Sequence, residues 1–281
     1  HIHGGFGINF DKADSNAIRD FAKQAFEKGI AAFCPTLTGE CPEKMQEKLE
    51  AIKEAKASQK KGEALIIGAN LEGTFLSREK PGVQNPDVFL EPDIENFKKI
   101  TGKFEDIVKI VVMAPENKNC DEFIKYLKSK DIKVHFGHTA ARSLEGADCI
   151  NHLFNAMEPM THKHETLAIK ALLDKEIYTE LIADTIHVTE DVLKLTFKTR
   201  PLNKIILISD ALPIASSNSD EIEFCGKKIL KNGFDEKGTL GGSVMLLPEI
   251  VRQLDKKGIL PLESGIKAAF DNPRDYLKLM V

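Results

Sequence analysis

The sequence predicts an α/β protein, and specifically a (β/α)8 barrel of the TIM type. Short apolar, mainly β-branched runs recur along the 281 residues, amphipathic segments lie between them, and the alternation extends over most of the chain. Continuous apolar runs are typical of strands covered on both faces, as in a parallel sheet. Seven or eight such strands alternating with helices over roughly 250 residues indicate a barrel.

The elements follow one another in a regular order. After an opening fragment at residues 1–3, strands are predicted at residues 30–33, 64–69, 107–113, 132–136, 148–151, 178–183 and 204–209. Apolar residues recur at helical spacing in residues 17–26, 120–129, 189–198 and 246–257, which predicts helices there. Asp14 or Ser15 is a suitable cap for the first helix, and Gly29 is a suitable stop.

Residues 220–242 interrupt this alternation. Turn signals at Asn232-Gly233 and Lys237-Gly238 predict a hairpin or flap beside the last strand. The remainder has no internal repeat or low-complexity linker, so residues 1–281 are interpreted as one barrel domain. A doubly wound open sheet would fit the same alternation, but no GxGxxG follows a strand, which weakens its nucleotide-binding form.

Composition excludes several classes of function. The chain has 39 basic and 43 acidic residues, a net charge of −4, which argues against nucleic acid or an anionic membrane as the partner. No apolar run approaches the ~20 residues of a membrane span. Five cysteines without a CxxC spacing indicate reduced thiols and a cytoplasmic protein rather than a disulfide framework.

Polar residues cluster where the predicted strands end. His1 and His3 lie two apart on one strand and face the same side. Because the carboxyl ends of barrel strands meet at one rim, residues far apart in sequence converge there. Histidine nitrogens and carboxylate oxygens are ligands of divalent metals such as Zn²⁺. The remaining residues at these strand ends are Glu72, His138, His152 and Asp210.

Each of these residues also has a purely structural interpretation. Glu72 alone could be a buried ion-pair partner, and Asp210 alone could cap the next turn. The joint pattern favours a metal site over these interpretations. Three other histidines are assigned no ligand role: His135 is predicted to be a hydrogen-bonded core residue, and His162 and His164 are predicted to be solvated in a polar loop.

Several sequence blocks, in this order along the chain, resemble the N-acetylglucosamine-6-phosphate deacetylase family of the amidohydrolase superfamily. The most specific blocks are LEG at residues 71–73, HLFNAM at residues 152–157 and IADTIHV at residues 182–188. Shorter matches include MAPE at residues 113–116 and SDA at residues 209–211. The resemblance covers nearly the whole chain and implies a metal-dependent amidohydrolase barrel acting on N-acetylglucosamine 6-phosphate.

The resemblance implies a role for each site residue. Glu72, His138 and His152 would hold the main metal, His1 and His3 would hold a second one, and Asp210 would be the general acid/base. Coordination to a divalent metal lowers the pKa of water toward ~7, which supplies the nucleophile for amide hydrolysis. We expect one or two ions, with zinc first and iron, manganese or cobalt as alternatives. The implied substrate-binding groups are Asn155, the backbone at Ala156, and His187.

The chain departs from the family pattern in four places. Gln84 stands where the family usually has histidine. Lys163 stands where the family usually has an arginine that binds the phosphate, in the family across a dimer interface. Only 13 residues separate His138 from His152, so a very short crossover helix is expected. The sequence begins at the first metal motif, so we expect an incomplete first strand and no small flanking β-domain.

Three functional hypotheses remain open at this point. The first is a cytoplasmic, homodimeric deacetylase of N-acetylglucosamine 6-phosphate. The second, prompted by Gln84 and Lys163, is a deacetylase of N-acetylgalactosamine 6-phosphate or another N-acyl sugar phosphate. The third is a non-catalytic sugar-phosphate-binding module.

Overall fold

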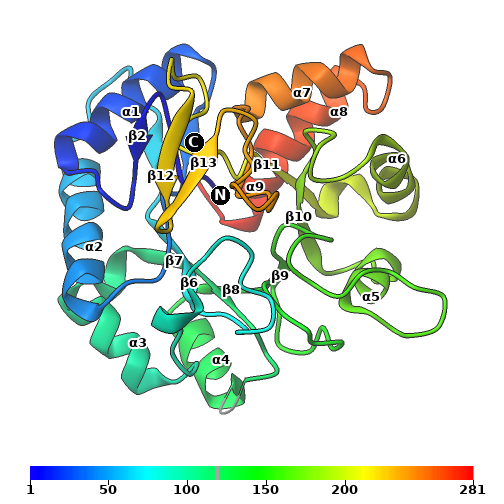
Figure 1. Cartoon of the computed structure of the whole chain (residues 1–281), viewed down its shortest axis with the longest axis horizontal. Coiled ribbons are helices and arrows are strands. Elements are labelled where there is room, and N and C mark those ends of the chain that lie inside the picture. Colours follow the sequence, from blue (N-terminus) through cyan, green and yellow to red (C-terminus); the bar gives the residue numbers. More distant parts are fainter. Residues whose placement is uncertain (118–119, 281) are drawn as a thin grey trace.

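The structure is a computed structural model that describes residues 1–117 and 120–280. In this part of the chain, seven parallel strands form one sheet in the order β11-β10-β9-β8-β7-β6-β4, and helices form an outer ring around it (Figure 1). Each crossover therefore leads to the next strand of the sheet, as in a barrel. The strands are β4 (Thr36–Leu37), β6 (Ala69–Phe75), β7 (Val108–Met113), β8 (Lys133–Phe136), β9 (Cys149–Ile150), β10 (Tyr178–Ile182) and β11 (Ile205–Ile208).

The first three residues connect the two edges of this sheet. Ile2 forms a parallel bridge with Pro35, and its carbonyl oxygen accepts from the N–H of Thr36 at 2.9 Å. On the other side, the N–H of Asp210 donates to the carbonyl of His1 at 3.2 Å. A doubly wound sheet would leave these edges apart, so the hydrogen bonds favour the TIM-like barrel.

The second and third barrel strands are longer than predicted and are each divided. β3 (Ala32–Phe33) pairs with β5 (Leu65–Ile66), and the two strands resume as β4 and β6. The break before β6 contains Gly68, where φ is +152° and a Cβ would lie 2.4 Å from the carbonyl oxygen of Ile107. The apolar pattern in the sequence ends at residue 69, but the buried strand β6 continues to Phe75 with polar site residues in it. The prediction from the apolar pattern is therefore too short.

Four predicted helices are confirmed within one or two residues of their expected bounds. α1 (Ser15–Glu27) begins at the cap Asp14, whose Oδ1 accepts from the N–H of Ala17 at 2.8 Å. The others are α4 (Cys120–Ser129), α6 (Glu190–Thr199) and α7 (Leu247–Lys256). Further helical elements are α2 (Pro42–Ala57), η1 (Pro86–Val88), α3 (Ile94–Thr101), η2 (Gly102–Ile107), α5 (Leu167–Leu173), η3 (Leu202–Lys204), α8 (Leu262–Ile266), the π-helical η4 (Lys267–Asp271) and α9 (Asn272–Tyr276).

The predicted flap is present, and it contains one more hairpin turn than the sequence predicts. β12 (Glu221–Phe224) pairs antiparallel with β13 (Lys227–Leu230), and the turn between them is Cys225-Gly226, with φ of 52° and 71°. Positive φ at both central residues is the geometry of a tight hairpin turn. The predicted turns at Asn232-Gly233 and Lys237-Gly238 each close a further antiparallel bridge, the first between Ile229 and Asp235 and the second between Phe234 and Leu240. A preceding small hairpin joins β1 (Gly4–Gly5) to β2 (Ile8–Asn9).

The expected short helix between β8 and β9 is not formed. Residues 137–148 run as loop and turn. The loop is fixed from outside by Glu116, whose carboxylate accepts from the hydroxyl of Thr139 and, at 2.7 Å, from the N–H of Ala140. Side-chain hydrogen bonds thus hold in place the residues directly after His138.

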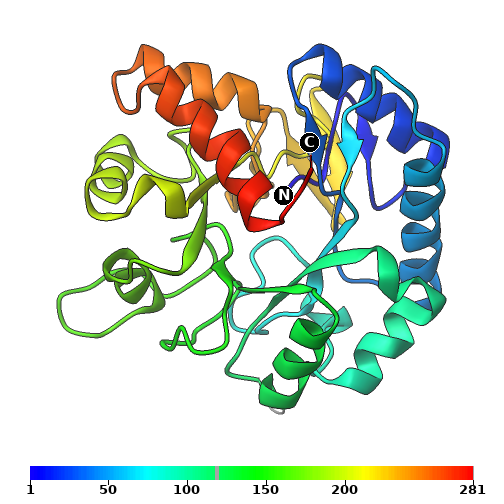
Figure 2. The same ribbon diagram turned by 180° about the vertical axis from the view of Figure 1, so that it is seen from behind.

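The barrel interior is closed from behind by the C-terminal helices, which reach the centre of the ring (Figure 2). Tyr276 of α9 is buried, and its hydroxyl lies 3.1 Å from Nε2 of His135. His135 is itself buried in β8, so the prediction of a hydrogen-bonded core histidine is confirmed. His162 and His164 are exposed in the loop before α5, as predicted.

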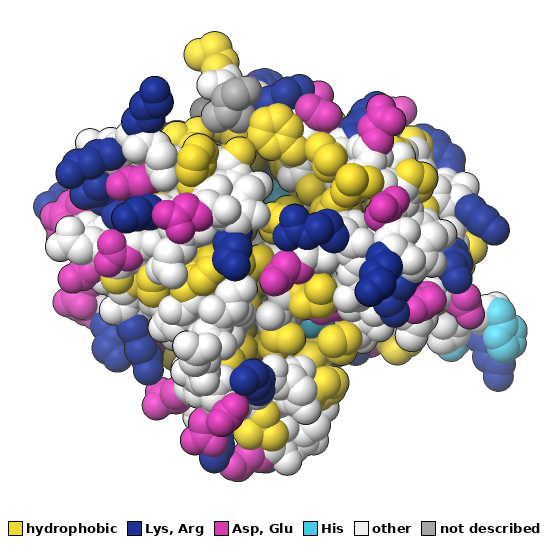
Figure 3. Space-filling view, turned by 90° about the horizontal axis from the view of Figure 1, so that it is seen from above, with side chains coloured by type: hydrophobic (Ala, Val, Ile, Leu, Met, Phe, Trp, Pro, Cys, Tyr) yellow, Lys and Arg dark blue, Asp and Glu magenta, His cyan; other side chains and the backbone are white. Residues whose placement is uncertain are grey.

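An apolar groove runs along the outside of the barrel, where hydrophobic side chains gather in a hollow (Figure 3). Its volume is about 400 Å³, and residues 29–32 and the helices α7, α8 and α9 line it. Ile266 is 49% exposed there. None of the helices in the described residues is long and apolar enough to cross a bilayer.

Candidate metal centre and active site

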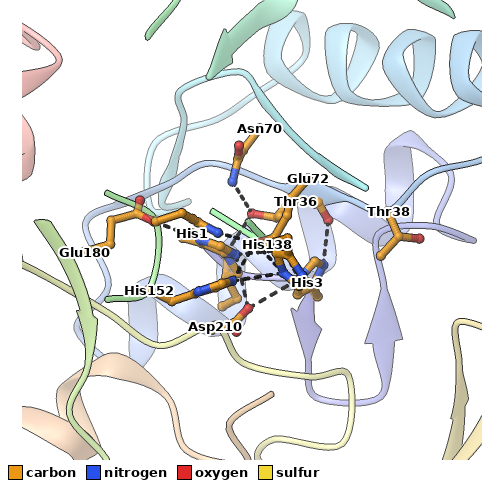
Figure 4. Close-up of polar contacts among 12 residues, drawn as sticks. His1, His3, Thr36, Thr38, Asn70, Glu72, His138, His152, Glu180 and Asp210 are labelled. Carbon is orange, nitrogen blue, oxygen red and sulfur yellow. Dashed lines mark hydrogen bonds and ion pairs between the residues drawn. The ribbon is translucent and has the colours of Figure 1, made fainter. Parts of the chain in front are cut away.

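Glu72 lies at the centre of the predicted site and faces a different set of histidines with each carboxylate oxygen (Figure 4). Its Oε1 lies 3.0 Å from Nε2 of His152 and 3.6 Å from Nε2 of His138. Its Oε2 lies 3.2 Å from Nε2 of His1 and 3.0 Å from Nε2 of His3. The side chains predicted from the ends of different strands therefore meet around one carboxylate.

Asp210 belongs to the second of these sets. Its Oδ1 lies 3.1 Å from Nε2 of His1 and 3.3 Å from Nε2 of His3. The structure thus forms two groups of potential metal ligands that share Glu72: one with His138 and His152, the other with His1, His3 and Asp210. The two groups contain the predicted ligand residues, and Asp210 lies with the second group.

Hydrogen bonds from the far side of the rings fix which nitrogen faces the centre. Nδ1 of His138 donates to the carbonyl of Lys80 at 2.9 Å, and Nδ1 of His3 donates to the carbonyl of Thr36 at 3.2 Å. In the neutral ring, Nε2 then carries a lone pair that is directed at the carboxylates. Such outer hydrogen bonds orient histidine ligands in metal sites.

Three of the site residues have left-handed backbone conformations. The φ angles are 48° for His138, 23° for His152 and 50° for Asp210. Positive φ is uncommon for residues with a side chain and is concentrated at functional sites, where the surrounding structure maintains it. Each of the three follows the end of a barrel strand, so the strained turn directs the side chain over the barrel opening.

The charges of the site stabilise one another. Burial alone would raise the pKa of Glu72, but the adjacent His1, His138 and His152 hold it well below its usual value. Burial would lower the pKa of His3, yet hydrogen bonds to Asp210 and Glu72 raise it to about 9. Buried carboxylates need a positive partner, and here the partner is a proton on a ring or a bound cation.

The ligand spacing fits a divalent cation. Nε2 of His138 and Nε2 of His152 are 3.1 Å apart, although both can present lone pairs. Two ligands of a tetrahedral zinc ion with bonds of about 2.0–2.1 Å are separated by about 3.3 Å. The donor set of imidazoles and carboxylates suits borderline metals. The residues present therefore fit a centre for a divalent metal ion.

A cavity of about 200 Å³ opens beside the metal centre. Four of the predicted substrate-binding residues line it, namely Gln84, Asn155, Ala156 and His187. Gln84 is 4% exposed, and its Oε1 has no hydrogen-bond partner among the described residues. The flap contributes Phe224, which packs edge-on against His3 at 5.1 Å between ring centres. The size and polarity of this cavity suit a small polar ligand rather than a polymer.

Lys163 does not line this cavity. It is exposed in the loop before α5 and is not among the residues that line the cavity.

Several supporting residues were not predicted. Asn151 donates to Oε1 of Glu72 at 2.6 Å, and Asp184 contacts Nδ1 of His187 at 2.8 Å. Glu180 lies 3.1 Å from Nδ1 of His1. Asp184 lies inside the IADTIHV motif and Asn151 directly precedes the HLFNAM motif, so their position near a predicted residue was an available signal. Glu180 lies within an apolar strand and gave no comparable signal.

The chain is similar to curated deacetylases over most of its length. It is 31% identical to N-acetylglucosamine-6-phosphate deacetylase of Bacillus subtilis over 266 residues, which cover 90% of this chain and 67% of that protein. It is also 31% identical to the Caenorhabditis elegans protein of the same name over 303 residues, covering 98% of this chain and 71% of that one. N-acetylgalactosamine-6-phosphate deacetylase of Escherichia coli O157:H7 is 26% identical over 276 residues, with 94% and 72% coverage.

Solved structures show the same fold. The N-acetylglucosamine-6-phosphate deacetylase of Pasteurella multocida superposes with a TM-score of 0.89 at 25% identity, covering 99% of this chain and 75% of that chain. The Mycobacterium smegmatis enzyme in complex with N-acetyl-D-glucosamine-6-phosphate gives a TM-score of 0.90 at 24% identity, with 99% and 76% coverage. No family model matches the chain. The identity and coverage of the curated relatives show that the chain belongs to the N-acetylglucosamine-6-phosphate deacetylase family.

Proposed function

We propose that this protein hydrolyses the N-acetyl group of N-acetylglucosamine 6-phosphate, giving glucosamine 6-phosphate and acetate. The observation that carries the proposal is the position of Glu72, which joins two groups of metal ligands beside a polar cavity of about 200 Å³. A bridging carboxylate among histidines is suited to hydrolysis and has no use in simple binding, which disfavours the non-catalytic alternative.

The reaction breaks the amide C–N bond and forms a C–O bond to water. A bound divalent cation supplies Lewis acidity, which lowers the pKa of water and polarises a carbonyl oxygen. Asp210, at the cavity wall, accepts a proton from the attacking water and passes it to the departing nitrogen. Asn155 and the backbone at Ala156 hold the phosphate, His187 holds the sugar, and the Gln84 amide donates a hydrogen bond to the substrate.

The metal is proposed to be zinc, with iron, manganese or cobalt as alternatives, and the two ligand groups support two ions. All described strands belong to the barrel or to its hairpins, which supports assigning residues 1–281 to one barrel domain. The buried thiol of Cys34, which donates to a carbonyl oxygen, supports a reducing, cytoplasmic location.

Acetate release from the phosphorylated sugar tests the proposed function. We expect the metal-loaded protein to release acetate from N-acetylglucosamine 6-phosphate and to lose this activity after chelation. The galacto epimer, assayed in parallel, distinguishes the two sugar specificities. A clear preference for the galacto epimer would overturn the gluco assignment, and no release from either sugar would favour the binding module.

Asp184→Asn is expected to raise the KM for the substrate by about tenfold. This is roughly the effect of losing one hydrogen bond, here the one between His187 and the substrate. Asp184 accepts the Nδ1 hydrogen of His187, so Nε2 faces the cavity as an acceptor. An amide at position 184 would donate to Nδ1 instead and move the ring hydrogen to Nε2. Steady-state kinetics measure the change, and an unaltered KM would contradict the role of His187.

The same substitution is expected to alter stability at acid pH. Burial opposes ionisation of Asp184, but the hydrogen bonds from His187 lower its pKa below the usual value. The carboxylate therefore adds stability above about pH 4, and this contribution disappears as the pH falls through the lowered pKa. The difference in Tm between wild type and Asp184→Asn should accordingly shrink on acidification.

We further propose a homodimer in which Lys163 binds the phosphate held by the partner subunit. Its exposed position, outside the cavity of its own chain, supports this arrangement. Lysine can bind phosphate as a point charge. Mixing Lys163→Ala with Asp210→Asn protein should restore about a quarter of the wild-type activity, because half of the randomly mixed dimers then have one intact site. No recovery on mixing would contradict a shared site.

A further inference from the structure

Glu180 is a buried carboxylate that the proposed reaction does not use. It lies in β10 and is 3% exposed, with its side chain inside the barrel beneath the metal centre. Its Oε2 lies 3.1 Å from Nδ1 of His1 (Figure 4). Its Oε1 lies 3.5 Å from Nδ1 of His135. No lysine or arginine pairs with it among the described ion pairs. Without these rings, burial of such a charge would be costly.

His1 differs from the other histidine ligands in what its outer nitrogen contacts. The outer nitrogens of His3 and His138 donate to backbone carbonyls. The outer nitrogen of His152 has no partner among the described residues. His1 alone of these four has a carboxylate at that position. A carboxylate partner fixes the ring orientation and makes the inner nitrogen more basic than a neutral partner does.

Glu180 is itself held from the opposite side. His135 contacts its second oxygen, and the other ring nitrogen of His135 lies 3.1 Å from the hydroxyl of Tyr276. Tyr276 is anchored in the C-terminal helix α9. The side chain of Glu180 therefore has little freedom to turn away from His1, which is what a group that positions a ligand requires.

We propose that Glu180 is a positioning residue for His1 and that it secures the cation bound by His1, His3, Asp210 and Glu72. This inference rests on the proposed function, since that function assigns His1 as a ligand. Nδ1–H of His1 is donated to Glu180, which leaves Nε2 to the cation. The cation held by His138, His152 and Glu72 does not depend on Glu180, because the hydrogen bond and ion pairs of the Glu180 carboxylate in the described structure go to His1 and His135.

Zinc titration of Glu180→Gln tests the proposal. The amide keeps the shape of the side chain and removes its charge. Changes in such outer partners weaken metal binding by about 10–100-fold. Competition with a chromophoric chelator should show this loss for the weaker of two bound zinc ions, with the tighter ion unchanged. Metal content after dialysis should fall from about two equivalents toward one.

Two controls separate positioning from general damage. Glu176→Gln makes the same chemical change four residues before Glu180, at a side chain that is 89% exposed. This variant should bind zinc as wild type does. Tyr276→Phe removes only the outermost hydrogen bond and should retain both ions. A Glu180→Gln titration that superimposes on wild type overturns the proposal. A loss shared equally by every bound ion also overturns it, because collapse of the site would give that result.

The outcome is independent of whether the proposed activity is correct. If wild-type protein loaded with zinc releases no acetate, the proposed function fails, while the titration still decides the role of Glu180. If wild type is active and Glu180→Gln binds zinc as wild type does, only the present inference fails.

Discussion

Glu72→Gln is expected to abolish acetate release and to reduce kcat/KM by more than about 10³-fold. This reduction is larger than the one that usually follows the removal of a single oxyanion-stabilising donor. Glu72 is the one residue that both groups of ligands share, so its loss weakens both ion positions together. An amide also replaces one of the two oxygens by an N–H donor, which would then face Nε2 of either His152 or His3, each 3.0 Å from Glu72. Metal analysis of the purified variant should accordingly show a loss of both ions.

Glu79→Gln is the matched control for this prediction. Glu79 is exposed seven positions further along the same segment, and the same loss of charge there should leave metal content and kcat/KM unchanged. If Glu72→Gln retained two ions and near wild-type activity, the bridging role would be wrong. Retention of one ion with no activity would show instead that the shared carboxylate is needed for only one of the two positions.

The ligand set could be predicted because its signals are local in sequence and its convergence follows from topology. His138, His152 and Asp210 each come directly after a strand, and parallel barrel strands end at one rim. Their positive φ angles could not be predicted, since none of the three residues is a glycine. The backbone there is determined by the contacts of the assembled site rather than by local preference.

The residues that support the ligands were harder to predict. Glu180 lies in a strand whose neighbours are apolar, and only the assembled barrel brings its carboxylate to the outer nitrogen of His1, 179 positions away. The length of β6 was also underestimated, because the hydrophobic pattern ends where site residues such as Asn70 and Glu72 begin. Both errors occur where a buried strand carries polar groups for function, which is where sequence rules are expected to fail.

The connection between His138 and His152 shows a different limit. A parallel crossover was expected to contain a helix, but residues 137–148 form a loop. The carboxylate of Glu116, which lies 23 positions before Thr139, provides hydrogen bonds to this loop that a helix would have made internally. The sequence spacing showed that the connection is short. Its conformation could not be predicted, because it depends on the Glu116 side chain, which belongs to another crossover.

Asp210→Asn is expected to reduce kcat by about 10²–10⁴-fold, the usual contribution of a general acid/base, with little change in KM. Burial would raise the pKa of Asp210, but His1 and His3 lower it below its usual range. The carboxylate is therefore ionised at neutral pH and able to accept a proton from water. Asparagine keeps the shape of the side chain but cannot accept and return that proton.

Because Oδ1 of Asp210 also contacts Nε2 of His1 and His3, metal content must be measured beside the kinetics. We expect Asp210→Asn to retain the ion held by Glu72, His138 and His152. Asp191→Asn, at a side chain 98% exposed, provides the matched control and should behave as wild type. If Asp210→Asn lost all bound metal, its inactivity would reflect ligand loss. Unchanged acetate release from the metal-loaded variant would assign proton transfer to another group.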